Sequence, residues 1–375
     1  MHLNPIRALA NTILMSAILT SCAASATTAE KSNAPTVPVV STGSLAGAPY
    51  RIDVPAGWNG ELVMYMHGYE PPGFPRQPEM SQTDFDRWLL AKGYAVAQSQ
   101  YAAPGWAVAE ALADNERLRL KVIAENGKPN RTYLIGQSLG GHLALASLER
   151  QPESYDGALV LCGANSPASE IFADGVLAPL VAFEVYFPNR LGLAAGGLAD
   201  PNSPPMVDPN ALEAALQSNE ANSKVLADRF DLLREDLAGA LLMRYVVFRE
   251  LMARAGGFPV DNRNTEYTGF GDDAVFNAQV RRYTGDADAI DYVAAHAPLS
   301  GLAVKPVVVL SNNNDPTIPA NISARYAELA RDNGNADNVY TLPSIGKGHC
   351  AFTPEDIDKA FDVLTTWVSS GNRPH

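Results

Sequence analysis

Short apolar runs alternate with longer stretches of helical periodicity over most of the chain. Each run is rich in apolar or β-branched residues and is bounded by turn-forming residues, which is typical of a buried strand. Strands are predicted at residues 37–40, 49–54, 61–66, 94–98, 132–135, 157–162, 305–310 and 338–342. Helices are predicted at residues 83–92, 105–126, 139–148, 320–333 and 354–370. This alternation predicts a parallel sheet covered by helices.

The alternation is interrupted after residue 164. Helical periodicity without strands continues over residues 169–187, 209–217, 222–255 and 273–281. We interpret residues 165–300 as an inserted helical lobe, and residues 37–164 and 301–375 as the core of the fold. Because an insertion at this point leaves the sheet at the carboxyl ends of its strands, where ligands bind in such sheets, the lobe is predicted to be a lid.

The first 22 residues have the pattern of an export signal. Arg7 is followed by an apolar run, residues 8–19, that is too short to span a bilayer. The run ends at Leu19-Thr20-Ser21-Cys22, which resembles the lipobox of a bacterial lipoprotein, so Cys22 is predicted to carry a lipid anchor in the cell envelope. An ordinary secretory signal is the alternative, and both predict export. Residues 23–36, rich in alanine, serine and threonine, are predicted to be a flexible tether.

Composition limits the function. With 375 residues, of which 46% are hydrophobic and 18% charged, the chain can bury one large core and an inserted lobe. Its net charge of −13 argues against nucleic-acid binding, because no basic stripe is present to neutralise phosphates. The sequence has no phosphate-binding loop, no His-Glu-x-x-His and no Cys-x-x-Cys, so neither a cofactor nor a metal site is predicted.

A Gly-x-Ser-x-Gly turn lies between a predicted strand and a predicted helix. Its sequence is Gly136-Gln137-Ser138-Leu139-Gly140. Glycines on both sides of a serine allow a backbone too tight for a Cβ atom, so the hydroxyl can project above the sheet. Ser138 is therefore the predicted nucleophile.

A serine hydroxyl needs a base and a carboxylate that orients the base. His349 is the predicted base, because it alone among the histidines lies in a glycine-rich loop after the last strand. Asp315 follows the strand at 305–310 and is the predicted carboxylate. It could instead cap the next helix, but Pro319 marks that helix start better. Asp286 and Asp288 are the alternative carboxylates.

The motifs together resemble the α/β-hydrolase superfamily over residues 37–370. The resemblance rests on His67-Gly68-Tyr69, Gly136-Gln137-Ser138-Leu139-Gly140, Asn314-Asp315-Pro316 and Gly348-His349-Cys350. It implies a mostly parallel, eight-stranded α/β sheet with helices on both faces and an inserted helical lid. It also implies an oxyanion hole formed by the backbone N–H groups of Tyr69 and Leu139. Tyr69 stands where many esterases of this superfamily have a second glycine.

The resemblance implies hydrolysis of carboxylic esters through an acyl-enzyme on Ser138, with a small-molecule or lipid ester as substrate. The apolar side chains of Phe183, Tyr186 and Phe187 are predicted to line the acyl pocket, and packing within the lobe itself is the alternative for each of them. A peptidase of the same superfamily is an alternative, in which a lobe carboxylate would hold the substrate amine. Candidates for that carboxylate are Glu184, Glu213 and Glu250. A lipoprotein that uses the fold only to bind a ligand is a third reading.

Two cysteines remain after Cys22. Cys162 ends the strand next to the nucleophile strand, and Cys350 follows His349. Because an exported chain meets an oxidising environment, Cys162 and Cys350 are predicted to form a disulfide near the active site. Two buried, reduced thiols are the alternative.

Overall fold

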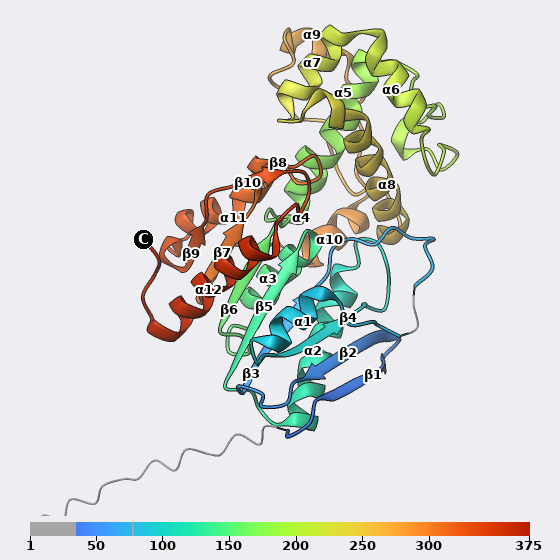
Figure 1. The fold of residues 1–375 in the computed structure, drawn as a ribbon. Helices are drawn as coiled ribbons and strands as arrows, with labels where there is room; N and C mark the ends of the chain where they lie inside the picture. The colour runs from blue at the N-terminus through green and yellow to red at the C-terminus, as the bar shows by residue number, and fades with distance from the viewer. Residues whose placement is uncertain (1–34, 77–78, 297) are drawn as a thin grey trace, which may run out of the picture. The chain divides into compact units, whose positions relative to one another are not determined.

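The computed structural model describes residues 35–76, 79–296 and 298–375 (Figure 1). The predicted signal with Cys22, and nearly all of the predicted tether, lie outside these described residues. Export and lipidation therefore stay predictions. Within the described part of the chain, no helix is long and apolar enough to cross a membrane.

An eight-stranded sheet organises the fold, with strand order β1-β2-β4-β3-β5-β6-β7-β9. The pairs β1–β2 and β2–β4 are antiparallel, and all the others are parallel. The predicted mostly parallel sheet is confirmed. Its strands are β1 (Val39–Leu45), β2 (Ala48–Val54), β3 (Glu61–Met66), β4 (Ala95–Ser99), β5 (Arg131–Gln137), β6 (Gly157–Leu161), β7 (Val307–Leu310) and β9 (Val339–Thr341).

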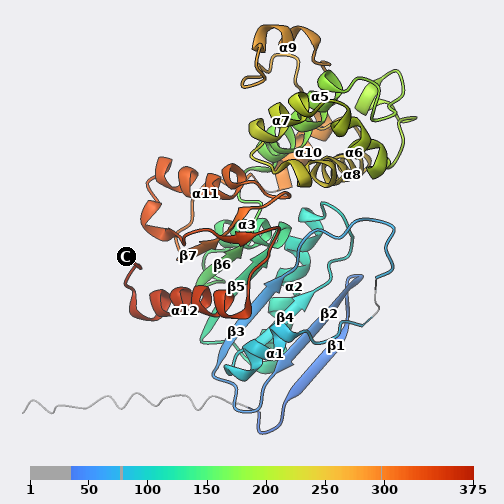
Figure 2. The same ribbon diagram turned by 45° about the horizontal axis from the view of Figure 1, so that its top comes forward.

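Helices cover both faces of the sheet, because its central strands are apolar on both sides. Met64 of β3 belongs to a buried cluster with side chains of α2, α3 and α11, whereas Val63 belongs to a second cluster with side chains of α1 and α12. Figure 2 shows α1 and α12 on the same side of the sheet. These helices are α1 (Asp84–Ala91), α2 (Val108–Asn126), α3 (Leu139–Arg150), α11 (Ala320–Asp332) and α12 (Pro354–Ser370), with a short η4 (Ala336–Asn338) before β9.

Between β6 and β7 the described residues contain helices and no strand. The predicted helix at 222–255 is in fact two helices, because Asp231 has a φ of 52° and breaks the helical path. Helix α10 was not predicted. The segments are α4 (Ala168–Glu170), the π-helix η1 (Ile171–Leu177), α5 (Ala178–Tyr186), η2 (Gly197–Ala199), α6 (Pro209–Ser218), α7 (Glu220–Arg229), η3 (Arg234–Asp236), α8 (Leu237–Ala255), α9 (Asp273–Gln279) and α10 (Ala287–His296).

Candidate active site

Ser138 occupies a sharp turn between β5 and α3. Its φ of 56° and ψ of −121° lie in a region that non-glycine residues rarely adopt. The flanking glycines make the turn possible. A Cβ on Gly136 would lie 2.0 Å from the carbonyl oxygen of Gly140, and a Cβ on Gly140 would lie 1.9 Å from that of Met66. Local sterics therefore require both glycines and hold the serine at the carboxyl end of β5.

Ser138, His349 and Asp315 form a continuous chain of hydrogen bonds. The Nδ1–H of His349 donates to Asp315 Oδ2 at 2.8 Å, and Ser138 Oγ–H donates to His349 Nε2 at 2.9 Å. Because a carboxylate only accepts hydrogen bonds, Asp315 sets the imidazole tautomer and leaves Nε2 free to accept. The structure thus brings together the three residues that the sequence singled out.

Backbone donors hold the Asp315 carboxylate in place. Its Oδ1 accepts from the N–H groups of Thr317 at 2.8 Å and Ile318 at 2.9 Å, and the residue is only 4% exposed. Asp315 does not cap α11, whose N-cap is Pro319 as the sequence suggested; one oxygen of Asp315 holds the loop before that helix, and the other faces His349. Asp286 lies elsewhere, where its Oδ2 accepts from the N–H of Phe258 at 2.6 Å.

A second, two-stranded sheet positions the acid loop beside the base loop. Strand β8 (Asn312–Asn314) pairs in parallel with β10 (Ile345–Lys347), and the N–H of Gly348 donates to the carbonyl of Asn314 at 2.8 Å. Neither strand was predicted. Three consecutive asparagines lack the β-branched or aromatic side chains that favour a strand. Strand β8 therefore forms only because β10 is beside it as a hydrogen-bonding partner.

Two backbone N–H groups next to Ser138 have no hydrogen-bond acceptor among the described residues. They belong to Tyr69 and Leu139, the predicted oxyanion-hole donors. Gly68 makes this approach possible, because a Cβ there would lie 3.2 Å from the Cβ of Ser138. A side chain at position 68 would crowd the nucleophile.

Cys162 and Cys350 form a disulfide with a Cα–Cα distance of 5.2 Å. Cys162 directly follows β6, the neighbour of the nucleophile strand, and Cys350 directly follows the base. The Sγ atom of Cys350 lies 3.6 Å from His349 Nε2. The disulfide therefore ties the base loop to the sheet edge that carries Ser138. While it is intact, its sulfurs are not available as thiolate ligands for a metal.

Three other described histidines, His67, His142 and His296, are engaged elsewhere. His142 is fully buried, with Nδ1 2.8 Å from the carbonyl oxygen of Ala164, and burial lowers its pKa to about 4. His67 stacks on Tyr101 with ring centroids 4.0 Å apart, and burial lowers its pKa as well. His296 has Nδ1 2.7 Å from the carbonyl oxygen of Tyr292 in its own helix.

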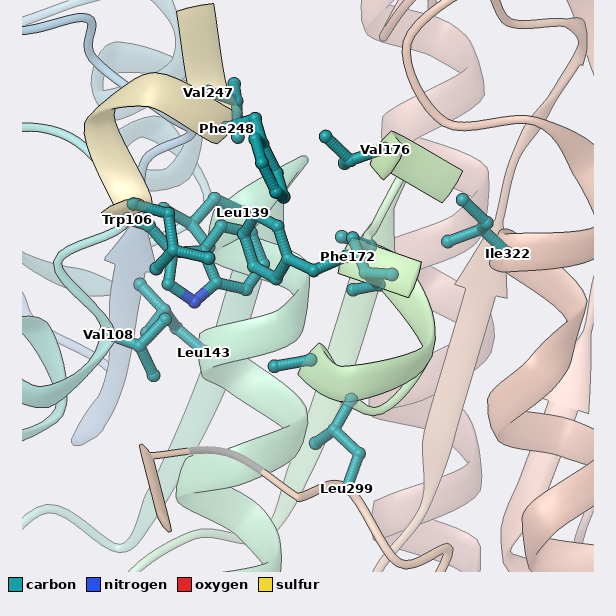
Figure 3. Close-up of a cluster of buried hydrophobic side chains, with 14 of the residues drawn as sticks. Trp106, Val108, Leu139, Leu143, Phe172, Val176, Val247, Phe248, Leu299 and Ile322 are labelled. Atoms are coloured by element: carbon teal, nitrogen blue, oxygen red, sulfur yellow. The ribbon is translucent and has the colours of Figure 1, made fainter. Parts of the chain in front are cut away.

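A narrow apolar cavity adjoins Ser138. The volume of this cavity is about 70 Å³. Lobe and core both contribute to its wall, and five of its apolar side chains are labelled in Figure 3: Trp106, Leu139, Val176, Val247 and Ile322. The polar groups of the wall include Ser138, Arg244 and Thr317.

The aromatic residues predicted to line the acyl pocket do not line this cavity, so that prediction is wrong. Phe183 packs against Phe187 with ring centroids 5.1 Å apart, and Tyr186 packs against Phe270 and Phe276. The lobe residues that line the cavity belong to η1, which precedes α5 in the chain, and to α8, which contributes Met243 and Val247. These aromatic side chains therefore pack against other aromatic residues of the lobe.

Solved structures show what this chain is similar to. Feruloyl esterase B from Aspergillus oryzae is 14% identical, with 90% of this chain and 81% of that chain covered and a TM-score of 0.50. The acylaminoacyl peptidase of Pyrococcus horikoshii is 11% identical (90% and 42% covered, TM-score 0.47), and an esterase from Rhodococcus sp. ECU1013 is 16% identical (88% and 98% covered, TM-score 0.43). At these identities the likeness shows the fold alone. No protein-family model matches the chain, and no curated protein matches its sequence.

Proposed function

We propose that this chain, which has the α/β-hydrolase fold, is a serine hydrolase that cleaves carboxylic esters through an acyl-enzyme on Ser138. One observation carries the proposal. The hydrogen bonds from Ser138 to His349 and from His349 to Asp315, at 2.9 and 2.8 Å, have the geometry that nucleophilic catalysis by serine requires.

In the acylation step, Ser138 Oγ attacks the ester carbonyl carbon while His349 Nε2 takes the hydroxyl proton. Asp315 stabilises the imidazolium that forms and keeps its orientation. The carbonyl oxygen becomes an oxyanion, which the N–H groups of Tyr69 and Leu139 would bind. Each such donor is typically worth ~10²–10³-fold in rate. His349 then returns the proton to the alcohol oxygen, and the alcohol leaves.

In the deacylation step, a water molecule replaces the alcohol. His349 takes a proton from this water, whose oxygen attacks the acyl carbon, and Ser138 leaves as the hydroxyl with the proton returned by His349. The products are the carboxylic acid and the free enzyme. This chemistry uses only the residues described above and needs no cofactor.

The cavity favours esters over peptides. Ile171, Val176, Met243 and Val247 of the lobe line it together with Ser138, which supports a role of the lobe as a lid over an apolar acyl group. The peptidase alternative needs a carboxylate in this cavity. Among the described lining residues there is no acidic side chain. None of the candidates Glu184, Glu213 and Glu250 lines the cavity; Glu213 pairs with Arg234, and Glu250 with Arg254.

A substrate panel tests the proposal. Purified protein is assayed with 4-nitrophenyl esters from acetate to decanoate and with aminoacyl 4-nitroanilides. We expect turnover of the esters, strongest for an apolar acyl chain that fits the cavity, and at least ~10-fold weaker turnover of the anilides. Faster turnover of the anilides than of the esters would contradict the esterase assignment and favour the peptidase alternative. If no compound were turned over, the reading of the chain as a binding protein would be favoured.

The disulfide yields a separate prediction. Its two cysteines are 188 residues apart, so its loss is expected to destabilise the fold by ~2–5 kcal/mol, with the upper value given by the entropy model. Reduction should also lower ester hydrolysis, because the segment that carries His349 loses its tie to β6. The measurement is kcat/KM and thermal unfolding with and without reductant.

The double variant Cys162→Ser/Cys350→Ser is the control, since its activity should not respond to reductant. Intact mass after alkylation of the denatured, unreduced protein gives an independent result. Uptake of two alkyl groups by these cysteines would rule out the disulfide.

A further inference from the structure

Arg244 of α8 is a buried cation in the wall of the Ser138 cavity. It is 4% exposed, and three of its N–H groups donate to backbone carbonyls. Nε donates to Gly175 at 2.8 Å, and Nη1 donates to Ala240 at 2.9 Å and to Pro316 at 3.1 Å. Burial lowers its pKa to about 10, so the guanidinium still carries its charge at neutral pH.

Among the described residues, no Asp or Glu oxygen lies within 4.0 Å of the guanidinium nitrogens of Arg244. Asp315 is the acidic group that influences it electrostatically, but both oxygens of Asp315 are already engaged, by His349 and by the N–H groups of Thr317 and Ile318. A buried ion without a partner is costly, so such residues are usually paired or functional.

The Nη2 atom of Arg244 is the guanidinium nitrogen for which the described residues supply no acceptor. The three hydrogen bonds of Arg244 come from Nε and Nη1. Arg244, together with Gly175 and Ile322, lines both the Ser138 cavity and a second cavity of about 350 Å³. The second cavity is mixed in charge, with Asp174, Asp231 and Arg229 in its wall.

We propose that Arg244 is an anion subsite that binds a carboxylate on the acyl part of the substrate, so that the preferred esters are half-esters of dicarboxylic acids. The inference rests on the proposed function. One end of such an acyl group would be attached to Ser138, its methylene chain would contact apolar residues such as Val176 and Ile322, and its free carboxylate would accept from Nη2. A guanidinium donor suits a carboxylate because the hydrogen bonds are charge-assisted.

Paired substrates test the subsite. The 4-nitrophenyl half-esters of adipic, pimelic and suberic acids are compared with 4-nitrophenyl hexanoate, heptanoate and octanoate, which have the same chain lengths without the second carboxylate. In the wild-type protein, kcat/KM should favour at least one half-ester over its partner by ~10–100-fold, the usual effect of a hydrogen bond to a charged group. Arg244→Met should bring that ratio to about one.

The alternative role of Arg244 is structural, bracing Gly175 and the loop at Pro316. If Arg244 had only this structural role, Arg244→Met would lower kcat/KM for both esters of a pair in the same proportion. The ratio within the pair would then be unchanged, and this result would overturn the proposal. Arg249→Met is the matched control. Arg249 is also on α8 and donates to the backbone carbonyls of Leu198 and Asp200, away from the Ser138 cavity, so its loss should not change the ratio.

Binding of the carboxylic acid product distinguishes the anion-subsite proposal from the esterase proposal. Calorimetry should show adipate binding to the wild-type protein at least ~10-fold more tightly than hexanoate, with the difference lost in Arg244→Met. Equal affinity for the two acids, or equal kcat/KM within every ester pair, would overturn the anion subsite while leaving the esterase proposal intact. If no ester were hydrolysed but adipate bound through Arg244, the esterase proposal would fail and the subsite would stand.

Discussion

Replacing Ser138 with alanine is expected to lower kcat/KM for 4-nitrophenyl esters by ~10⁴-fold or more, because only binding and oxyanion stabilisation remain once the nucleophile is removed. The fold should persist. Alanine keeps the Cβ that the turn already accommodates, and the glycines at 136 and 140 that permit the turn are unchanged. The measurement is steady-state kinetics, with circular dichroism and thermal unfolding to show that the variant is folded.

Ser369→Ala is the control for the loss of a serine hydroxyl. Ser369 is exposed on α12, where its Oγ donates to the carbonyl of Thr366 at 3.1 Å. Activity of this control should equal that of the wild type. A Ser138→Ala variant with activity within tenfold of the wild type would contradict the assignment of the nucleophile.

Asp315→Asn is expected to lower kcat by roughly 10³–10⁴-fold. The reason lies in the fixed donors around the carboxylate. The N–H groups of Thr317 and Ile318 require an acceptor, so the amide oxygen of asparagine should face them and its NH₂ group should face His349 Nδ1. His349 would then carry its proton on Nε2 and could no longer accept the proton of Ser138. The change is nearly isosteric, so the variant should fold.

The control for this variant is Asp286→Asn, at the alternative carboxylate named from the sequence. Asp286 accepts from the N–H of Phe258, which joins two segments of the lobe, so a modest loss of stability is expected without a loss of kcat. If Asp315→Asn were silent and Asp286→Asn inactive, the acid would have been assigned to the wrong residue.

The order of strands and helices in the core could be predicted from the sequence, because a buried strand in a parallel sheet is a short apolar run whatever its neighbours are. Strand β6, for example, is buried at all five of its positions. Strands β8 and β10 could not be predicted. Their residues form strands only because the two segments meet in space, although they are more than 30 positions apart in the chain.

The candidate triad was named from local chemistry and chain order. The turn at Ser138 depends on Gly136 and Gly140, and this steric requirement is readable in the sequence itself. Asp315 and His349 each follow a strand, and parallel strands end at one edge of a sheet. The same reasoning placed Cys162 beside Cys350. These features depend on short segments and on the fold class, so the sequence alone was sufficient to predict them.

Only the tertiary structure decided which lobe residues face the cavity. Phe183 and Val176 are both apolar and both lie in the first helical stretch of the lobe, yet Val176 lines the cavity and Phe183 packs against Phe187. The burial of Arg244, with no carboxylate partner among the described residues, could not be predicted either, because an arginine on a helix is usually solvated. Which side chains meet across a cavity depends on how distant helices pack, and the periodicity of a single helix does not contain that information.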